Sequence, residues 1–97
     1  YPTLGGIFIG GSNDSTLSSA AFQTKVASGS WLVAVDDEGG RVQRIDNLVG
    51  SMPAAFKQTS QTPAEVTAMA KRRGEQLRSY GINMNLAPVV DLRADGS

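Results

Sequence analysis

Acidic residues follow two apolar segments of this sequence, at the points where those segments end. Three acids occupy positions 36–38, directly after the apolar run 31–35, and Asp91 follows the segment 86–90. In α/β folds, ligands bind at the C-terminal ends of the strands, so carboxylates at these places could converge on one small polar ligand. The competing interpretation is that they are solvated loop residues or helix caps, since strand ends are polar in any case.

A glycine pair and two arginines follow the first acidic cluster. Gly39 and Gly40 permit a turn that side chains would block. Neither G-x-G-x-x-G nor G-x-x-x-x-G-K-[ST] occurs, so this turn is not predicted to bind phosphate. Arg41 and Arg44 lie three residues apart, and the guanidinium fork of an arginine can donate hydrogen bonds to a carboxylate or to sugar hydroxyls. A structural ion pair is the alternative for either arginine.

The composition excludes several other chemistries. The chain has no His and no Cys, so it cannot by itself supply a Ser-His-Asp triad, a His- or Cys-ligated zinc site, a Cys nucleophile or a disulfide. The acids at 36–38 offer oxygen ligands, but no D-x-D-x-D-G spacing supports a Mg²⁺ or Ca²⁺ site. No metal and no cofactor are therefore predicted.

Charge and hydropathy also limit the partners. Nine Lys and Arg balance nine Asp and Glu, so nothing electrostatic favours nucleic acid or an anionic membrane surface. No apolar run approaches the roughly 18 residues that a membrane span needs. The localisation is not predicted: many Ser and Thr against few Lys slightly favour export or the cell envelope, and a cytoplasmic location stays open.

The elements that must position these residues alternate along the chain. The length of the chain predicts one domain over residues 1–97. The segment 36–60 has no clear hydrophobic period, which predicts a long loop with one helical turn. The clearest element is a helix that begins at a capping box, Thr62 to Glu65, and ends before Gly81. In order, the patterns predict a strand within 5–11, a helix over 16–28, a strand over 31–35, a helix over 62–80 and a strand over 82–88.

This βαβαβ order predicts a parallel sheet, because crossovers between parallel strands are right-handed. Three such strands alone would leave both sheet edges open. The pattern therefore fits three consecutive units of a larger α/β structure, either a barrel or an open doubly wound sheet. Gly74 predicts close helix-to-strand packing, Asn83 and Asn85 need polar partners, and Arg72, Arg73 and Arg78 are expected on a solvated helix face.

The segment Asp36-Asp37-Glu38-Gly39-Gly40-Arg41-Val42-Gln43-Arg44 resembles a signature of glycoside hydrolase family 3. It is most similar to D-x-E-G-G-R-V-x-R of the β-N-acetylhexosaminidase branch, which includes bacterial cell-wall-recycling enzymes. A preceding glycine-flanked strand (5–10) and the later segment Leu86-Ala87-Pro88-Val89-Val90-Asp91 also match, so the resemblance covers nearly the whole chain. It implies that the chain is the N-terminal βαβαβ portion of a (β/α)₈ TIM-type barrel.

The resemblance also implies roles for the acidic segment. Asp36 would hydrogen-bond hydroxyls of the non-reducing sugar, Arg44 would clamp the same ring, and Asp91 would add a third substrate contact or shape the pocket. The residues expected to shape the pocket around them are Glu38, Gly39, Gly40 and Arg41. No catalytic group is expected in this chain, because the family's nucleophilic Asp and this branch's acid/base His lie in later segments.

The function implied is that of a piece of a retaining exo-β-N-acetylglucosaminidase, which binds a carbohydrate and needs the remainder of its own barrel. The 97-residue chain alone is expected to be inactive and not stably folded. One alternative is a family 3 β-glucosidase or β-xylosidase. Another is a non-catalytic sugar-binding or self-assembling α/β module, which would explain the open strand edges.

Overall fold

The computed structural model describes residues 5–11, 14–27, 29 and 31–92. Three short strands alternate with helices in the order that the sequence predicts. The strands are β1 (Gly6–Ile9), β2 (Leu32–Val35) and β3 (Met84–Asn85), and the helices are α1 (Asp14–Leu17), α2 (Ala20–Ala27), α3 (Asp46–Val49), the 3₁₀ helix η1 (Ala55–Ser60) and α4 (Pro63–Ser79).

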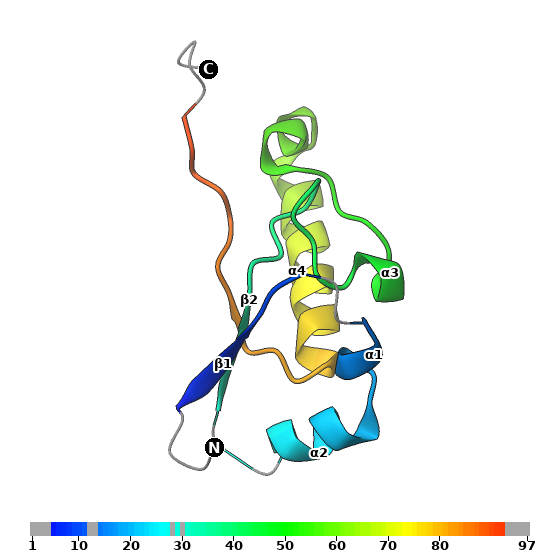
Figure 1. Ribbon diagram of the computed structural model, residues 1–97. Coiled ribbons are helices and arrows are strands. Elements are labelled where there is room, and N and C mark those ends of the chain that lie inside the picture. The colour runs from blue at the N-terminus through cyan, green and yellow to red at the C-terminus, as the bar shows by residue number, and fades with distance from the viewer. Residues whose placement is uncertain (1–4, 12–13, 28, 30, 93–97) are drawn as a thin grey trace.

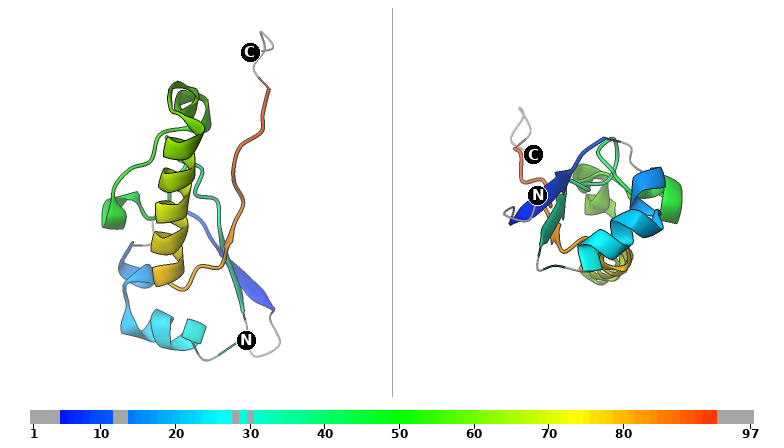
Figure 2. Two further views of the ribbon diagram at one scale, coloured as in Figure 1. Left: turned by 180° about the vertical axis from the view of Figure 1, so that it is seen from behind. Right: turned by 60° about the horizontal axis from the view of Figure 1, so that its bottom comes forward.

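The three strands form one parallel sheet in the order β1-β2-β3. Gly6 pairs with Leu32 at the start of the β1–β2 ladder, and Val35 pairs with Asn85 where β2 meets β3. The helices lie on one side of this sheet, with the long α4 beside β2 (Figures 1 and 2). The predicted α/β class with a parallel sheet is therefore confirmed, whereas closure into a barrel stays a prediction.

Each strand presents one face to the helices and the other away from them. Ile9, Val33 and Val35 are buried and belong to a core that also contains Leu17, Ile45, Leu77 and Ile82. On the other side of the strands, Phe8, Leu32 and Met84 are exposed. Period-2 alternation accounts for this division, since successive side chains of a strand point to opposite faces. One face of the sheet is thus covered and the other is open.

Local signals fix the ends of the helices. The Thr62 hydroxyl accepts a hydrogen bond from the Glu65 amide at 3.1 Å, and the Glu65 carboxylate accepts one from the Thr62 amide at 3.4 Å, which confirms the capping box. Gly81, with φ at +82°, follows the C-terminus of α4. The helix expected over 16–28 is instead two helices, because the Ser19 side chain accepts a hydrogen bond from the Phe22 amide and starts α2 anew.

Three other expectations need correction. The loop 36–60 contains two short helices, α3 and η1, rather than one helical turn. The strand expected over 82–88 is paired only at Met84–Asn85, and Pro88 further along has no amide hydrogen to continue a ladder. Gly74 does not mark close helix-to-strand packing, because a Cβ added there would meet nothing within 4 Å.

Candidate sugar-binding site

The first sequence-predicted site residues, Asp36 and Arg44, form a bidentate ion pair. Arg44 Nε donates to Asp36 Oδ1 at 2.6 Å, and Arg44 Nη2 donates to Asp36 Oδ2 at 2.9 Å. Both side chains stay partly accessible, with 28% of Asp36 and 19% of Arg44 exposed. Two parallel hydrogen bonds fix the planes of the two groups relative to each other, which is the geometry that an arginine fork gives to a carboxylate.

The pair holds both groups in their charged forms. The hydrogen bond from Arg44 lowers the pKa of Asp36 below its ordinary value of 3.8, against an opposing contribution from burial. The same hydrogen bond raises the pKa of Arg44 above its ordinary value. Asp36 is therefore an anionic hydrogen-bond acceptor, and Arg44 a cationic donor, throughout the neutral pH range.

Asp37 points away from this pair into the protein and is fully buried. Its Oδ1 accepts a hydrogen bond from the backbone amide of Arg44 at 2.8 Å. Its own backbone amide donates to Asn85 Oδ1 at 2.9 Å, and its carbonyl accepts from Asn85 Nδ2 at 3.1 Å. Asp37 thus joins the end of β2 both to Arg44 and to β3.

The glycine turn between Asp37 and Arg44 is closed by an antiparallel bridge. Gly39 and Val42 exchange backbone hydrogen bonds at 3.0 and 3.2 Å, and the Gly40 amide donates to the Met52 carbonyl at 2.8 Å. Both glycines have positive φ, +87° at Gly39 and +61° at Gly40. A Cβ on Gly39 would collide with the Pro53 carbonyl oxygen. The turn therefore needs glycine for its backbone conformation and for its contact with the 50–54 segment.

The other predicted site residues lie outside the Asp36–Arg44 ion pair. Glu38 is half-buried, and its amide donates to the Val42 carbonyl at 2.8 Å, so its backbone helps to close the turn. Arg41 is exposed at the tip. Asp91 is also exposed, and within the part of the chain that the structure describes no hydrogen bond or ion pair joins it to Asp36 or Arg44. Their roles in shaping a pocket or in binding remain predictions.

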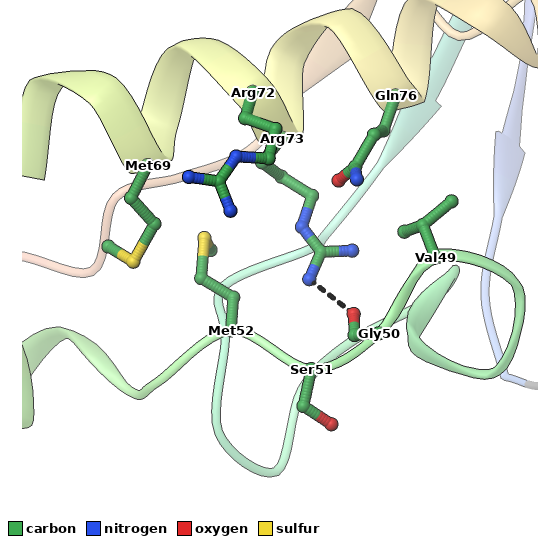
Figure 3. Close-up of a pocket in the computed structure, with 8 residues that line it drawn as sticks. All are labelled: Val49, Gly50, Ser51, Met52, Met69, Arg72, Arg73 and Gln76. Carbon is green, nitrogen blue, oxygen red and sulfur yellow. Dashed lines mark hydrogen bonds between the residues drawn. The ribbon is translucent and has the colours of Figure 1, made fainter.

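The prediction for Arg73 is wrong. This residue of α4 is only 5% exposed, and its Nε lies 3.5 Å from Asp37 Oδ2. Figure 3 shows its guanidinium reaching from α4 to the 49–52 segment, where Nη2 donates to the Gly50 carbonyl at 2.8 Å. Arg72 and Arg78 are exposed, as expected. A buried anion within reach explains the difference, because a charged side chain is buried when it finds a partner.

Two hollows beside α4 do not include the ion pair. The hollow in Figure 3 has a volume of about 60 Å³, too little for a sugar ring, and lies between α4 and residues 49–52. The second, about 250 Å³, lies between α4 and β3. Neither is lined by Asp36 or Arg44.

The described residues contain no group of three or more His, Cys, Asp or Glu able to hold a metal ion. They also include no helix long and apolar enough to cross a membrane.

The supporting roles of Asp37 and Arg73 are not predicted by the sequence, although a signal for both is present in it. Val33, Val35 and Asp37 share one parity along an extended segment, so alternation places Asp37 on the covered face. Met69, Arg73 and Leu77 are spaced by four residues, which places Arg73 on the helix face that Leu77 buries. The expected need of Asn83 and Asn85 for polar partners is confirmed, since Asn83 bonds to the backbones of Val33 and Trp31 and Asn85 bonds to the backbone of Asp37.

The sequence matches a known family. Residues 2–97 match the N-terminal domain of glycosyl hydrolase family 3, which is nearly the whole chain. The chain therefore belongs to glycosyl hydrolase family 3, as its resemblance predicts. Its fold agrees with a glycosyl hydrolase of this family from Mycobacterium smegmatis, with a TM-score of 0.83 and 38% sequence identity over 94% of this chain and 29% of that one.

Curated relatives carry more specific names. The chain is 40% identical over 94 residues to beta-hexosaminidase LpqI of Mycobacterium tuberculosis, which covers 92% of this chain and 24% of the relative. The solved structure of LpqI gives a TM-score of 0.81. Beta-hexosaminidase A of Pseudoalteromonas piscicida is 37% identical over 81% of this chain and 14% of its own length. The chain thus spans about a quarter or less of these relatives.

The glycine turn yields a first prediction. Substituting Gly39→Ala in the complete polypeptide should lower the free energy of unfolding by at least about 2 kcal/mol, because left-handed strain adds to a collision with the Pro53 carbonyl. Gly11→Ala is the matched control, since Gly11 has φ at +69° but no atom of the described residues within 4 Å of an added Cβ. Urea unfolding measures both. Equal losses in the two variants would contradict the contact with the 50–54 segment.

The ion pair yields a prediction on pH. The folded-state pKa of Asp36 is lowered, so its stabilisation is fully present above the ordinary value of 3.8 and is lost as pH falls through the lower folded value. The stability difference between wild type and Asp36→Asn should therefore be constant near neutral pH and shrink below pH 3.8. Urea unfolding at several pH values measures it. In an Arg44→Met background the acid dependence should disappear, and its persistence there would contradict the assignment to Arg44.

Proposed function

We propose that this chain is the sugar-binding N-terminal part of a retaining exo-β-N-acetylglucosaminidase that hydrolyses terminal N-acetyl-β-glucosaminides of cell-wall-type glycans. The observation that carries the proposal is the Asp36–Arg44 pair at the end of β2, within the segment that resembles the family signature. The names of the curated relatives support the hexosaminidase branch.

The pair has the hydrogen-bonding capacity that a sugar needs. Ionised Asp36 has about four lone-pair sites, of which two accept from Arg44, so the carboxylate keeps capacity for a hydroxyl donor. The Arg44 guanidinium has five N–H donors and uses two on Asp36. Adjacent hydroxyls of a ring can both donate to such a carboxylate and accept from such a guanidinium. Asp91, from the segment after β3, is proposed as a third contact.

The catalytic groups are proposed to come from other parts of the polypeptide. A retaining glycosidase needs a nucleophile and an acid/base group on either side of the scissile bond, and the double displacement passes through a glycosyl-enzyme intermediate. In this proposal Asp36 and Arg44 orient the terminal sugar for that displacement, and this chain supplies neither reacting group. No metal or cofactor is required.

The remainder of a (β/α)₈ barrel is the proposed partner of the open sheet face. Phe8, Leu32 and Leu86 are between 52% and 56% exposed, and large apolar side chains on one face of a sheet need a cover. The chain spans only 24% of LpqI, so most of such a polypeptide lies outside it. The further strands would pair with the edges of β1 and β3 and enclose these side chains.

Substrate preference and two substitutions test this proposal in the complete polypeptide. We expect 4-nitrophenyl N-acetyl-β-glucosaminide to be hydrolysed with a kcat/KM at least about 100-fold above that of the glucoside. Asp36→Asn and Arg44→Met should each lower kcat/KM by about 10- to 100-fold, because charged hydrogen bonds to the sugar are lost. Glu75→Gln and Arg78→Met, both on the exposed face of α4, are the matched controls and should leave kcat/KM unchanged.

The alternatives predict other results. A family 3 β-glucosidase or β-xylosidase would prefer the glucoside or xyloside, which would overturn the branch assignment and leave the sugar-binding pair in place. A non-catalytic or self-assembling module would hydrolyse none of these substrates and would form a defined oligomer. Full activity of Asp36→Asn and Arg44→Met would remove the pair from substrate binding altogether.

A further inference from the structure

Arg73 is a buried charged residue on the helix side of the sheet, opposite the open face, and the proposed function does not use it. Its guanidinium is directed at three groups, which all belong to the segment between β2 and η1. Nε faces Asp37 Oδ2 at 3.5 Å, and Nη2 donates to the Gly50 carbonyl at 2.8 Å and to Gln43 Oε1 at 3.3 Å. The guanidinium spreads its donors over several nitrogens, whereas a lysine ammonium has all of its donors on one nitrogen.

Two of the residues that Arg73 contacts, Asp37 and Gln43, are linked to Arg44. Asp37, which Arg73 faces through one carboxylate oxygen, uses the other oxygen to accept the Arg44 backbone amide at 2.8 Å. Gln43, which Arg73 contacts through Nη2, is the residue before Arg44. Arg73 therefore acts on the backbone of Arg44 in two ways, through a buried carboxylate and through the preceding side chain.

Gln43 extends the network to the glycine turn. Its Nε2 donates to the Gly40 carbonyl at 2.8 Å, and its Oε1 also accepts the Met52 amide at 2.8 Å. The Arg73 guanidinium is thus linked to the end of β2 through Asp37, to the glycine turn through Gln43, and to the 50–52 segment through the Gly50 carbonyl. The Asp36–Arg44 pair is built on that frame, since both of its residues adjoin members of the network.

The energetics favour a positioning role over a stabilising one. Asp37 is fully buried and Arg73 nearly so, and the cost of removing two charges from water offsets most of their attraction. Asp37 Oδ2 and Arg73 Nη1 have no hydrogen-bond partner in the part of the chain that the structure describes, so the pair is not fully compensated. What the pair does provide is direction, because a displaced guanidinium would lengthen its contacts to Asp37, Gln43 and the Gly50 carbonyl together.

We infer that Arg73 is a positioning residue for sugar binding, which acts through Asp37 and Gln43 to place Arg44 against the terminal sugar. The inference rests on the proposed function of the Asp36–Arg44 pair. It assigns a substrate-related role to a residue of α4 that does not touch the substrate. Small displacements of a positioning contact can cost up to about 100-fold in rate.

The test is a double-mutant cycle in the complete polypeptide, measured as kcat/KM for 4-nitrophenyl N-acetyl-β-glucosaminide per folded molecule. Asp37→Asn with Arg73→Met removes the ion pair without leaving a buried charge, and the amide introduced by Asp37→Asn keeps an acceptor oxygen for the Arg44 backbone. We expect this double substitution to lower kcat/KM by about 10- to 100-fold, mainly through KM. In an Arg44→Met background the same double substitution should change kcat/KM by less than about twofold.

The melting temperature separates positioning from stability. Any loss of melting temperature caused by the double substitution should be the same in the wild-type and Arg44→Met backgrounds, whereas its effect on kcat/KM should require Arg44. Arg72→Met, which removes an exposed neighbour on α4, is the control and should change neither quantity. An equal loss of kcat/KM in both backgrounds, or no loss in either, would overturn the inference.

The substrate preference of the wild type tests the proposed function separately from the positioning role of Arg73. If wild type prefers a glucoside, the branch assignment fails and the same cycle is measured with that glucoside. If wild type hydrolyses neither substrate, the proposed enzyme function fails. The cycle is then measured as the affinity for N-acetylglucosamine by titration calorimetry. Absence of any Arg44-dependent effect on that affinity would overturn the positioning role.

Discussion

The hydrogen bond between the buried Asp37 carboxylate and the backbone amide of Arg44 is the contact on which the site depends. The two residues are seven positions apart, with the glycine turn between them, and this 2.8 Å bond returns the chain to the end of β2. Without it, the backbone amide of Arg44 would lose its bond to the end of β2, and only the neighbouring residues Val42 and Gln43 would stay bonded to the turn. With it, Arg44 is held at two points, by its backbone on Asp37 and by its guanidinium on Asp36.

Asp36 and Asp37 are adjacent in an extended segment, so their side chains point to opposite faces of the sheet. Asp36 continues the parity of Leu32, on the open face, and Asp37 continues that of Val33, in the core. Neighbouring carboxylates therefore have different surroundings. Asp36 stays partly accessible beside Arg44, and Asp37 is enclosed with Arg73. The strand geometry alone produces this division, since a shift by one residue would exchange the two roles.

The sequence predicted those features that local patterns determine. The capping box, the glycine turn and the alternation of strands and helices each depend on a few adjacent residues, and the structure confirms them. The burial of Arg73 was not predicted: its spacing from Leu77 indicates the covered helix face, but its partner is a carboxylate 36 positions earlier in the chain. The shortness of β3 was not predicted either, because pairing depends on neighbours in space. The place of Asp91 in the site remains a prediction.

The central claim is that Asp36 and Arg44 together bind the terminal sugar, and the structure of the complete polypeptide with bound N-acetylglucosamine tests it most directly. The account predicts ring hydroxyls about 3 Å or less from both an Asp36 carboxylate oxygen and an Arg44 guanidinium nitrogen, with the bond from Asp37 to the Arg44 amide intact. A sugar bound with neither residue within hydrogen-bonding distance would contradict it.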